Sequence, residues 1–244
     1  MPPLVWGKAV ACKRGASVND GGRDNLKRKE EEAAMKLYYD PITVNCRKVL
    51  AGFKLMGTKY DEEKVDYFTG QFKSPEYTAI NPNQSLPAID DDGFIVWESN
   101  AILQYAADKD GKAEFYPKDL KTRTDINRWL LWEANQWFPS CYTFLVENVV
   151  KPLLEQKPDQ KILEAASPKF HQLADIIDKA VEKKPFLCGN KVTIADIAVA
   201  APMHLHKWQK LPLDQHPNLI KWMNRVEALP CWKETDAATL LGLS

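Results

Sequence analysis

The chain has 244 residues, 45% of them hydrophobic, and its 33 basic residues balance its 33 acidic ones. The apolar fraction excludes disorder for most of the chain. Zero formal charge argues against a nucleic-acid partner, because proteins that grip phosphate backbones carry a basic excess. No apolar run reaches the ~18–20 residues that span a bilayer, so we expect a soluble protein with no membrane partner.

The five cysteines are odd in number, scattered, and form no C-x-x-C pair. This usage fits neither a disulfide framework nor a zinc site, and it predicts a reducing, cytoplasmic environment. His204 and His206 do not predict a metal site either. On a helix, two residues at this spacing face apart, and no third ligand is near in sequence. We expect no metal, and we expect both histidines in solvent or at helix ends.

Residues 1–34 differ from the rest of the chain. They show no hydrophobic period, and residues 27–32 form a charge block. We therefore predict a disordered N-terminal extension over 1–34.

From residue 35 to 112 the sequence alternates between strand and helix patterns. The predicted elements are a strand over 37–39, a helix after 43, a polar edge strand over 59–65, a short helix within 66–82, strands over 86–89 and 94–97 around a turn at 90–93, and a helix over 98–109. This order, βαβ followed by a hairpin and a helix, predicts a compact α/β domain over 35–112.

A linker over 113–120 precedes an all-α domain over 121–244. The first expected helix opens this domain and continues to about 155, with breaks at Pro139 and Pro152. The second covers 159–183, with a kink or a new start at Pro168. The third begins after 193, and two more lie near 217–228 and 231–239. Thr193 and Asp196 have the spacing of a capping box at the start of the third.

Thr43 follows the turn at Asp40 and Pro41, at the point where the first helix should begin. A helix start offers unpaired N–H groups and a positive dipole end. A strand, a tight turn and a helix with a hydroxyl at its mouth therefore predict a site for a negative charge. An ordinary N-cap would also favour threonine here.

Four segments, in this order, resemble the cytosolic glutathione transferases. They are Pro41-Ile-Thr-Val-Asn-Cys-Arg-Lys-Val, Asn81-Pro-Asn-Gln-Ser-Leu-Pro87, Trp97-Glu-Ser-Asn-Ala-Ile and Phe186-Leu-Cys-Gly-Asn-Lys-Val-Thr-Ile-Ala-Asp-Ile197. The resemblance covers residues 35 to about 240. The hydroxyl four residues before Arg47 resembles the serine-type branch, which includes phi, theta and bacterial members.

The resemblance implies a thioredoxin-like N-terminal domain that binds glutathione as co-substrate. It also implies an all-α domain that completes a pocket for a hydrophobic electrophile, and a homodimer. Thr43 falls where these classes place the catalytic serine, with Asn45 as a reserve donor. Tyr38 or Tyr39 would be the reserve in a tyrosine-type mechanism, but we favour core packing for both and burial for Cys46.

The resemblance also implies binding residues. Those expected to hold glutathione are Lys73, Ser85, Leu86, Pro87, Glu98 and Ser99, with a cis bond before Pro87. Those expected to line the electrophile pocket are Ile42, Trp132, Phe138 and Tyr142, whereas Trp129 is expected in the core.

The leading hypothesis is an enzyme that conjugates glutathione to hydrophobic electrophiles, or runs a related peroxidase, dehalogenase or ether-cleaving reaction. Phe72 replaces a frequent histidine of the family, and Ser85 stands where Lys or Gln is common. These departures favour a second hypothesis, a non-catalytic binding or interaction module that keeps the fold.

Overall fold

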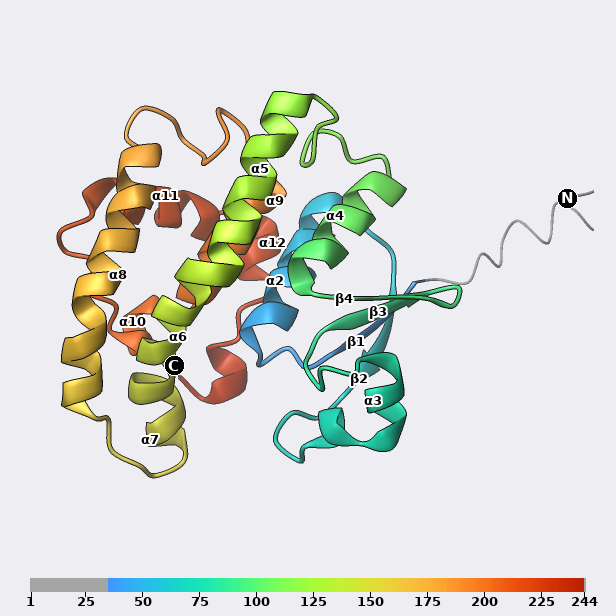
Figure 1. The fold of residues 1–244 in the computed structure, drawn as a ribbon, viewed down its shortest axis with the longest axis horizontal. Coiled ribbons are helices and arrows are strands. Elements are labelled where there is room, and N and C mark those ends of the chain that lie inside the picture. The colour runs from blue at the N-terminus through green and yellow to red at the C-terminus, as the bar shows by residue number, and fades with distance from the viewer. Residues whose placement is uncertain (1–34, 244) are drawn as a thin grey trace, which may run out of the picture. The chain divides into compact units, whose positions relative to one another are not determined.

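The structure is a computed structural model that describes residues 35–243, so the predicted extension over 1–34 lies outside the described residues. An α/β part comes first and a helical part follows (Figure 1). The elements of the α/β part are β1 (Lys36–Tyr39), α2 (Val44–Met56), β2 (Asp61–Lys64), η1 (Gln71–Lys73), α3 (Pro75–Ile80), β3 (Ala88–Asp91), β4 (Phe94–Trp97) and α4 (Ser99–Lys109).

The four strands form one sheet in the order β2-β1-β3-β4, with β1 and β2 parallel and the other pairs antiparallel. Side chains alternate between its faces. Leu37 pairs with Ile89 and both lie in the main core, whereas Tyr38 packs edge-on against Tyr77 of α3. Strand β2 is exposed along its length, as predicted for an edge strand. Strand β3 starts two residues later than predicted, after Pro87, which has no N–H for a ladder.

Helices α2 and α4 lie side by side between the sheet and the helical part (Figure 1). Gly52 permits their close approach, because a Cβ at this position would lie 2.2 Å from Leu103 Cδ2. Leu103 is fully buried, so it has little room to move aside. The spacing of these two helices positions the N-terminus of each beside the other.

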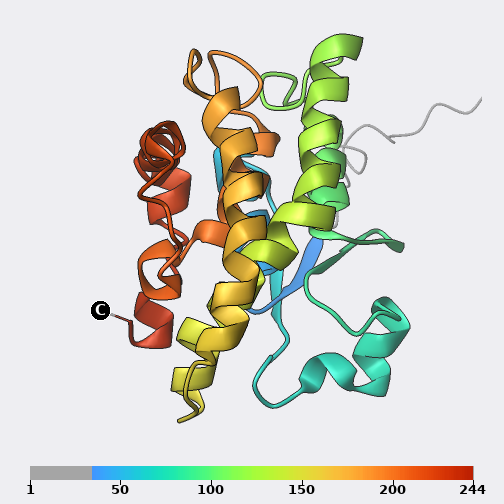
Figure 2. The same ribbon diagram turned by 60° about the vertical axis from the view of Figure 1, so that its left-hand side comes forward.

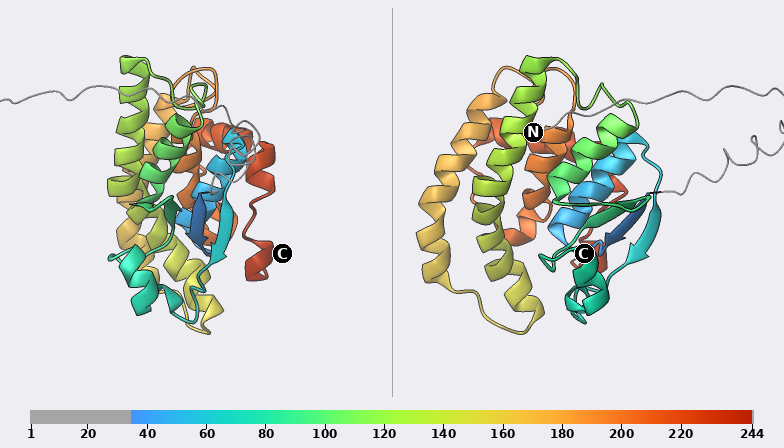
Figure 3. Two further views of the ribbon diagram at one scale, coloured as in Figure 1. Left: turned by 90° about the vertical axis from the view of Figure 1, so that its right-hand side faces the viewer. Right: turned by 45° about the vertical axis from the view of Figure 1, so that its right-hand side comes forward.

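The helical part contains one long helical run and several shorter helices (Figures 2 and 3). Its elements are α5 (Leu120–Trp132), η2 (Glu133–Trp137), α6 (Phe138–Leu145), η3 (Val146–Val150), α7 (Lys151–Leu153), α8 (Gln160–Ala180), α9 (Ile194–Ala200), η4 (Ala201–Met203), α10 (His206–Gln209), α11 (Pro217–Glu227), α12 (Pro230–Lys233) and η5 (Thr239–Leu241). Helix α8 packs against α6 on one side and α11 on the other (Figure 2).

The predicted helix breaks at Pro139 and Pro152 are wrong, because the run from α5 to α7 is continuous. Each proline follows a π-helical segment, η2 or η3. A π turn changes the i→i−4 pattern locally, so a residue without an N–H is accommodated there. Helix α8 also continues through Pro168 without a new start. The single helix expected over 231–239 is divided into α12 and η5.

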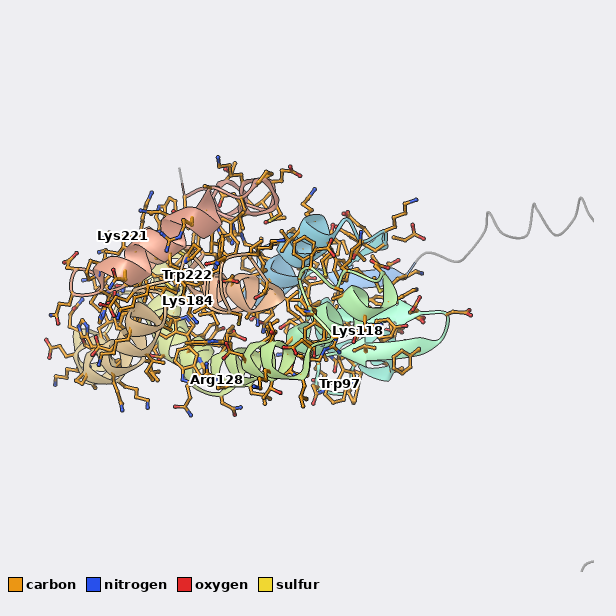
Figure 4. All side chains as sticks on the ribbon, turned by 90° about the horizontal axis from the view of Figure 1, so that it is seen from above. Trp97, Lys118, Arg128, Lys184, Lys221 and Trp222 are labelled. Atoms are coloured by element: carbon orange, nitrogen blue, oxygen red, sulfur yellow. The ribbon has the colours of Figure 1, made fainter. Side chains whose placement is uncertain are left out.

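One large core cluster extends across both parts of the chain. The predicted capping box of Thr193 and Asp196 is confirmed, and both residues are buried. Burial raises the pKa of Asp196, although Leu187 N and Trp222 Nε1 both donate to its carboxylate. Trp222 is fully buried on α11, next to the exposed Lys221 (Figure 4). Among residues 35–243, no helix combines the length and apolar character needed to cross a bilayer.

Candidate active site

The loop between β1 and α2 is organised by Asp40, a buried carboxylate. Its Oδ1 accepts from Ile42 N at 3.2 Å, and its Oδ2 accepts from Tyr67 N at 2.9 Å. Thr43 then caps α2 as predicted, since its hydroxyl oxygen accepts from Cys46 N at 3.4 Å. Asp40 therefore holds together the two loops that border the mouth of α2.

The Thr43 hydroxyl also donates its proton, in this structure to the backbone carbonyl of Asp40 at 3.2 Å. The same carbonyl accepts from the Thr43 N–H at 3.1 Å. If the hydroxyl turns toward another acceptor, the carbonyl keeps one hydrogen bond. Donation to an anion at the helix mouth would thus leave no buried carbonyl unpaired.

The neighbouring reactive groups are unsuited to the role predicted for Thr43. Cys46 is fully buried, and burial raises the pKa of its thiol to about 12. The hydroxyl of Tyr39 donates to Glu62 at 2.6 Å, and burial together with this bond raises its pKa. Tyr38 packs on Tyr77. The structure agrees with the packing roles expected for both tyrosines and for Cys46.

A chain of hydrogen bonds connects the helical part to the mouth of α2. Glu133, fully buried in η2, pairs with the Lys48 ammonium at 2.8 Å. Lys48 also donates to Ser99 Oγ at 3.1 Å and to Asn100 Oδ1 at 3.3 Å, so each of its three N–H groups has an acceptor. Ser99 in turn donates to Asn45 Oδ1 at 3.4 Å.

The direction of this chain fixes the orientation of Asn45. Lys48 can only donate, so the Ser99 oxygen accepts from it and the Ser99 proton is directed to the amide oxygen of Asn45. The amide NH₂ of Asn45 is then available as a donor. It comes from α2, two residues after Thr43.

The start of α4 is a second site with unpaired N–H groups. Its N-cap, Glu98, makes no side-chain capping bond, is exposed, and has a φ of 74°. A non-glycine residue at positive φ is uncommon and concentrates at functional sites. The hydroxyl of Ser99, the next residue, is buried and already bonded to Asn45. An anion at the start of α4 would therefore be bound mainly by backbone N–H groups.

The bond between Leu86 and Pro87 is cis, as predicted. Among the described residues, the N–H and C=O of Leu86 take part in no backbone hydrogen bond. The preceding residue, Ser85, has its carbonyl held by Tyr77 OH and Asn81 Nδ2, each at 2.7 Å. The loop thus presents the free N–H and C=O of Leu86, with which an extended backbone can pair.

Lys73, the cation expected near Ser85, lies in η1. Both residues are exposed, and the Lys73 ammonium lies 5.3 Å from the centre of the Phe72 ring. Phe72 itself is stacked on Tyr67 at 5.0 Å. The ring that replaces the expected histidine therefore packs against its own loop.

Two aromatic pairs contain three of the four residues expected to line the electrophile pocket. Phe138 and Tyr142 of α6 are stacked at 5.3 Å, and Phe138 packs on a cluster that includes Val44, the residue after Thr43. Ile42 is half-buried in the adjoining loop. Trp132 instead stacks on Trp137 at 5.8 Å, apart from the Phe138–Tyr142 pair.

Sequence reasoning missed Asp40, Tyr67, Lys48 and Glu133. Burial raises the pKa of Tyr142, and Tyr67 adds to this rise, so Tyr67 lies near Tyr142 of α6. A lysine inside an apolar helix face was a usable signal for Lys48. Nothing in the sequence pointed to Glu133, 85 residues away. No group of three His, Cys, Asp or Glu side chains within residues 35–243 has metal-binding geometry.

A sheet of order β2-β1-β3-β4 with a cis-proline before β3, followed by a helical domain, defines a thioredoxin-like protein with an all-α C-terminal domain. Family models for the N-terminal and C-terminal domains of glutathione S-transferases match residues 34–108 and 142–230. The chain belongs to the glutathione S-transferase family.

Individual relatives agree with this placement. A probable glutathione S-transferase, GSTF2, of Oryza sativa subsp. japonica is 28% identical over 81% of this chain and 94% of its own length. A delta-class glutathione transferase of Nilaparvata lugens is 29% identical, with a TM-score of 0.73 over 86% of this chain and 96% of that one. A theta-class enzyme of Xanthomonas axonopodis pv. citri, solved with glutathione bound, is 26% identical, with a TM-score of 0.73 over 83% and 97%.

Proposed function

We propose that this chain is a glutathione transferase of the serine-type branch, which activates the glutathione thiol for attack on hydrophobic electrophiles. The observation that carries the proposal is the hydroxyl of Thr43 at the mouth of α2. This hydroxyl can turn from the Asp40 carbonyl to a ligand at little cost, because the carbonyl still accepts from the Thr43 N–H. A cysteine thiol has a pKa of about 8.5, so little of it is thiolate at neutral pH. A hydroxyl donor and a helix N-terminus both favour the thiolate.

The surrounding groups suit the rest of glutathione. The free N–H and C=O of Leu86, beside cis Pro87, match the backbone of the cysteinyl residue. The bare N-terminus of α4 suits the γ-glutamyl carboxylate, and the exposed Glu98 carboxylate suits the ammonium. Lys73 and Ser85 remain the proposed contacts of the glycyl end.

Ser99 acts mainly through Asn45 in this proposal. Its hydroxyl is bonded on both sides, so it orients the Asn45 amide rather than presenting a free donor. Asn45 then supplies a second N–H donor near Thr43. Both would stabilise negative charge at the sulfur, with Thr43 the principal donor.

The electrophile would lie against Phe138, Tyr142 and Ile42, with Tyr67 closing the aromatic wall. These side chains suit a flat hydrophobic substrate. Trp132 is proposed as a more distant lining residue, because it stacks on Trp137.

Replacement of Thr43 by Val tests the proposal. It keeps the branched shape and removes the donor, so the pKa of bound glutathione should rise and conjugation should slow. A hydrogen bond to a charged group is worth about 1.5–3 kcal/mol, or roughly ten- to a hundredfold in the thiolate equilibrium. The deficit, measured with a generic aryl halide, should shrink as the pH rises.

Thr43→Ser is the matched control and should remain active, because it keeps the hydroxyl. If Thr43→Val turns over normally at every pH while Asn45→Ala does not, the principal donor is Asn45. If neither variant changes the pKa of bound thiol, the thiolate is stabilised elsewhere.

A non-catalytic glutathione-binding module is the second candidate. Two observations favour it: Phe72 stacks within its own loop, and the hydroxyl of Ser99 is already occupied. The two functions separate on immobilised glutathione. Retention of the chain without turnover of an aryl halide would identify the module, whereas retention with turnover identifies the enzyme.

The remaining parts of the proposal concern organisation. We propose a homodimer in the cytoplasm, with the glutathione domain over 35–112, a linker over 113–120 and the helical domain over 121–244. The family supports the two-domain division. Sedimentation equilibrium tests the dimer, and limited proteolysis within 113–120 tests the linker.

A further inference from the structure

A cavity of about 310 Å³ lies between α2, the segment from η4 to α10, and the residues that follow α11. None of the residues proposed above for glutathione or the electrophile lines it. Two of its lining side chains, Arg47 and His204, are more than nine-tenths buried. Each carries a polar nitrogen that has no hydrogen-bond partner within residues 35–243.

Arg47 is held rigidly at this cavity. Its Nε donates to Thr235 O at 2.6 Å and its Nη2 donates to Trp232 O at 3.1 Å. The guanidinium carbon lies 4.0 Å from the centre of the Trp232 ring. Burial lowers the pKa of Arg47 to about 10, so the group remains charged at neutral pH. Its Nη1 is therefore a fixed, charged donor without an acceptor.

His204 supplies a hydrogen-bond acceptor, whereas Arg47 supplies a donor. Its Nδ1 lies 3.0 Å from Ala201 O, and because a carbonyl only accepts, Nδ1 carries the proton. Burial, with the charge of Arg47 adding to it, lowers the pKa of His204 to about 3. The ring is neutral near pH 7, so its Nε2 is a bare acceptor without a donor.

The remaining charges favour an anion. Lys207 and Lys233 line the cavity and are exposed. Of the two lining carboxylates, Glu227 accepts from His206 Nε2 at 3.0 Å, and Asp236 accepts from Ala238 N at 3.1 Å. Three cations therefore face two carboxylates that already have donors.

We propose that this cavity binds a small oxyanion that carries its own hydroxyl, with the chemistry of monohydrogen phosphate or a 2-hydroxycarboxylate. An anionic oxygen accepts from Arg47 Nη1, and the ligand hydroxyl donates to His204 Nε2. An anion that carries no hydrogen atom can accept from Arg47 Nη1, but it directs a lone pair at the lone pair of His204 Nε2. That nitrogen then remains without a donor. This site is independent of the proposed glutathione function.

Two matched ligand pairs test the requirement for a hydroxyl. Calorimetric titration of the full chain compares inorganic phosphate with sulfate, at mildly alkaline pH where both carry two charges, and lactate with propionate. The hydroxyl-bearing member of at least one pair should bind about tenfold more tightly. The pair that discriminates identifies the source, phosphate or hydroxycarboxylate. Saturating glutathione should leave the affinity unchanged.

Two variants locate the binding. His204→Asn keeps a donor for Ala201 O and removes the Nε2 acceptor, so the preference within each pair should disappear. This readout is a ratio measured in one variant, so a loss of stability does not affect it. Lys207→Glu should weaken phosphate about tenfold. Lys221→Glu, on α11 and away from the cavity, is the charge-matched control and should change nothing (Figure 4).

Equal binding within both pairs, or no binding of any of the four, would overturn the proposal. Competition between phosphate and glutathione would overturn it as well, since the anion would then occupy the N-terminus of α4. A preference that survives in His204→Asn shows that the hydroxyl is recognised elsewhere.

Discussion

Two adjacent residues of α2, Arg47 and Lys48, are buried cations with opposite environments. Lys48 is neutralised by the Glu133 carboxylate, and every one of its N–H groups has a partner. Arg47 instead meets backbone carbonyls and an indole, and its Nη1 has no partner among residues 35–243. The charge of Lys48 is thus compensated within the protein, whereas Arg47 keeps one N–H donor that a ligand can use.

The difference lies in what compensates each charge. A buried ion pair is costly to break, because removal of one partner leaves the other charge desolvated. Backbone carbonyl dipoles compensate the charge of a guanidinium only in part. When the guanidinium is replaced, the groups left without a partner are neutral carbonyls, which cost less to bury than an unpaired charge. Substitutions on the two sides of α2 should therefore differ in their effect on stability.

The largest effect is expected on the Lys48 side. Lys48→Met leaves Glu133 unpaired and should lower the free energy of unfolding by about 3–5 kcal/mol, measured by urea denaturation. The double variant Lys48→Met with Glu133→Leu should recover most of this loss, since no buried charge remains. A double variant as unstable as the single one would show that hydrogen bonds to Ser99 and Asn100, and not the charge pair, are decisive.

Arg47→Met should cost less, about 1–3 kcal/mol. It removes the donor from Thr235 O, whereas Trp232 O still accepts from the Thr235 hydroxyl at 3.3 Å. Arg47→Lys should recover only part of this loss, because an ammonium lacks the planar fork. A loss equal to that of Lys48→Met, under the same urea conditions, would contradict the contrast.

The third prediction concerns pH on the Arg47 side. The pKa of His204 falls from an ordinary value near 6.5 to about 3 in the folded protein. Between these values the unfolded chain binds a proton that the folded one does not, so stability is lost as the pH falls below 6.5. The slope is up to about 1.4 kcal/mol per pH unit. The His204→Asn variant should lack this share of the slope.

The smallest effect is expected at an exposed cation of the same helix. Lys54 pairs with Glu234 at 3.1 Å, and their side chains are 40% and 58% exposed. Lys54→Ala should change stability by no more than about 0.5 kcal/mol, and less at high salt. A thermal shift as large as that of Arg47→Met would show that this pair fastens the C-terminal segment.

These contacts also explain what could be predicted from sequence. The Thr43 cap and the capping box ending at Asp196 each depend on a few consecutive residues, and both were predicted from them. The cis bond at Pro87 was predicted from the family resemblance and is also present. Glu133 lies 85 residues from Lys48, and Trp232 lies 185 residues from Arg47, so no local pattern contains either pair. The same holds for Tyr67, whose approach to Tyr142 depends on how a loop meets the distant helix α6.

The helix breaks failed for a related reason. Proline is a strong local signal, but its effect depends on whether neighbouring packing tolerates a π turn. Around Pro139 the flanking Trp137 and Cys141 are fully buried, so the core holds the helix through the irregularity. Tertiary context decided the outcome.

The two hydrogen bonds that hold Arg47 have a consequence for biosynthesis. Helix α2 leaves the ribosome early, yet the carbonyls that receive its guanidinium belong to residues 185 and 188 positions later. Contacts of such separation form late, because the intervening chain must first be made and collapsed. Until those residues have been made, Arg47 lacks the carbonyl acceptors that hold it in the complete fold. A nascent chain stalled before residue 232 should fail to protect α2 from protease, whereas the released full-length chain should protect it.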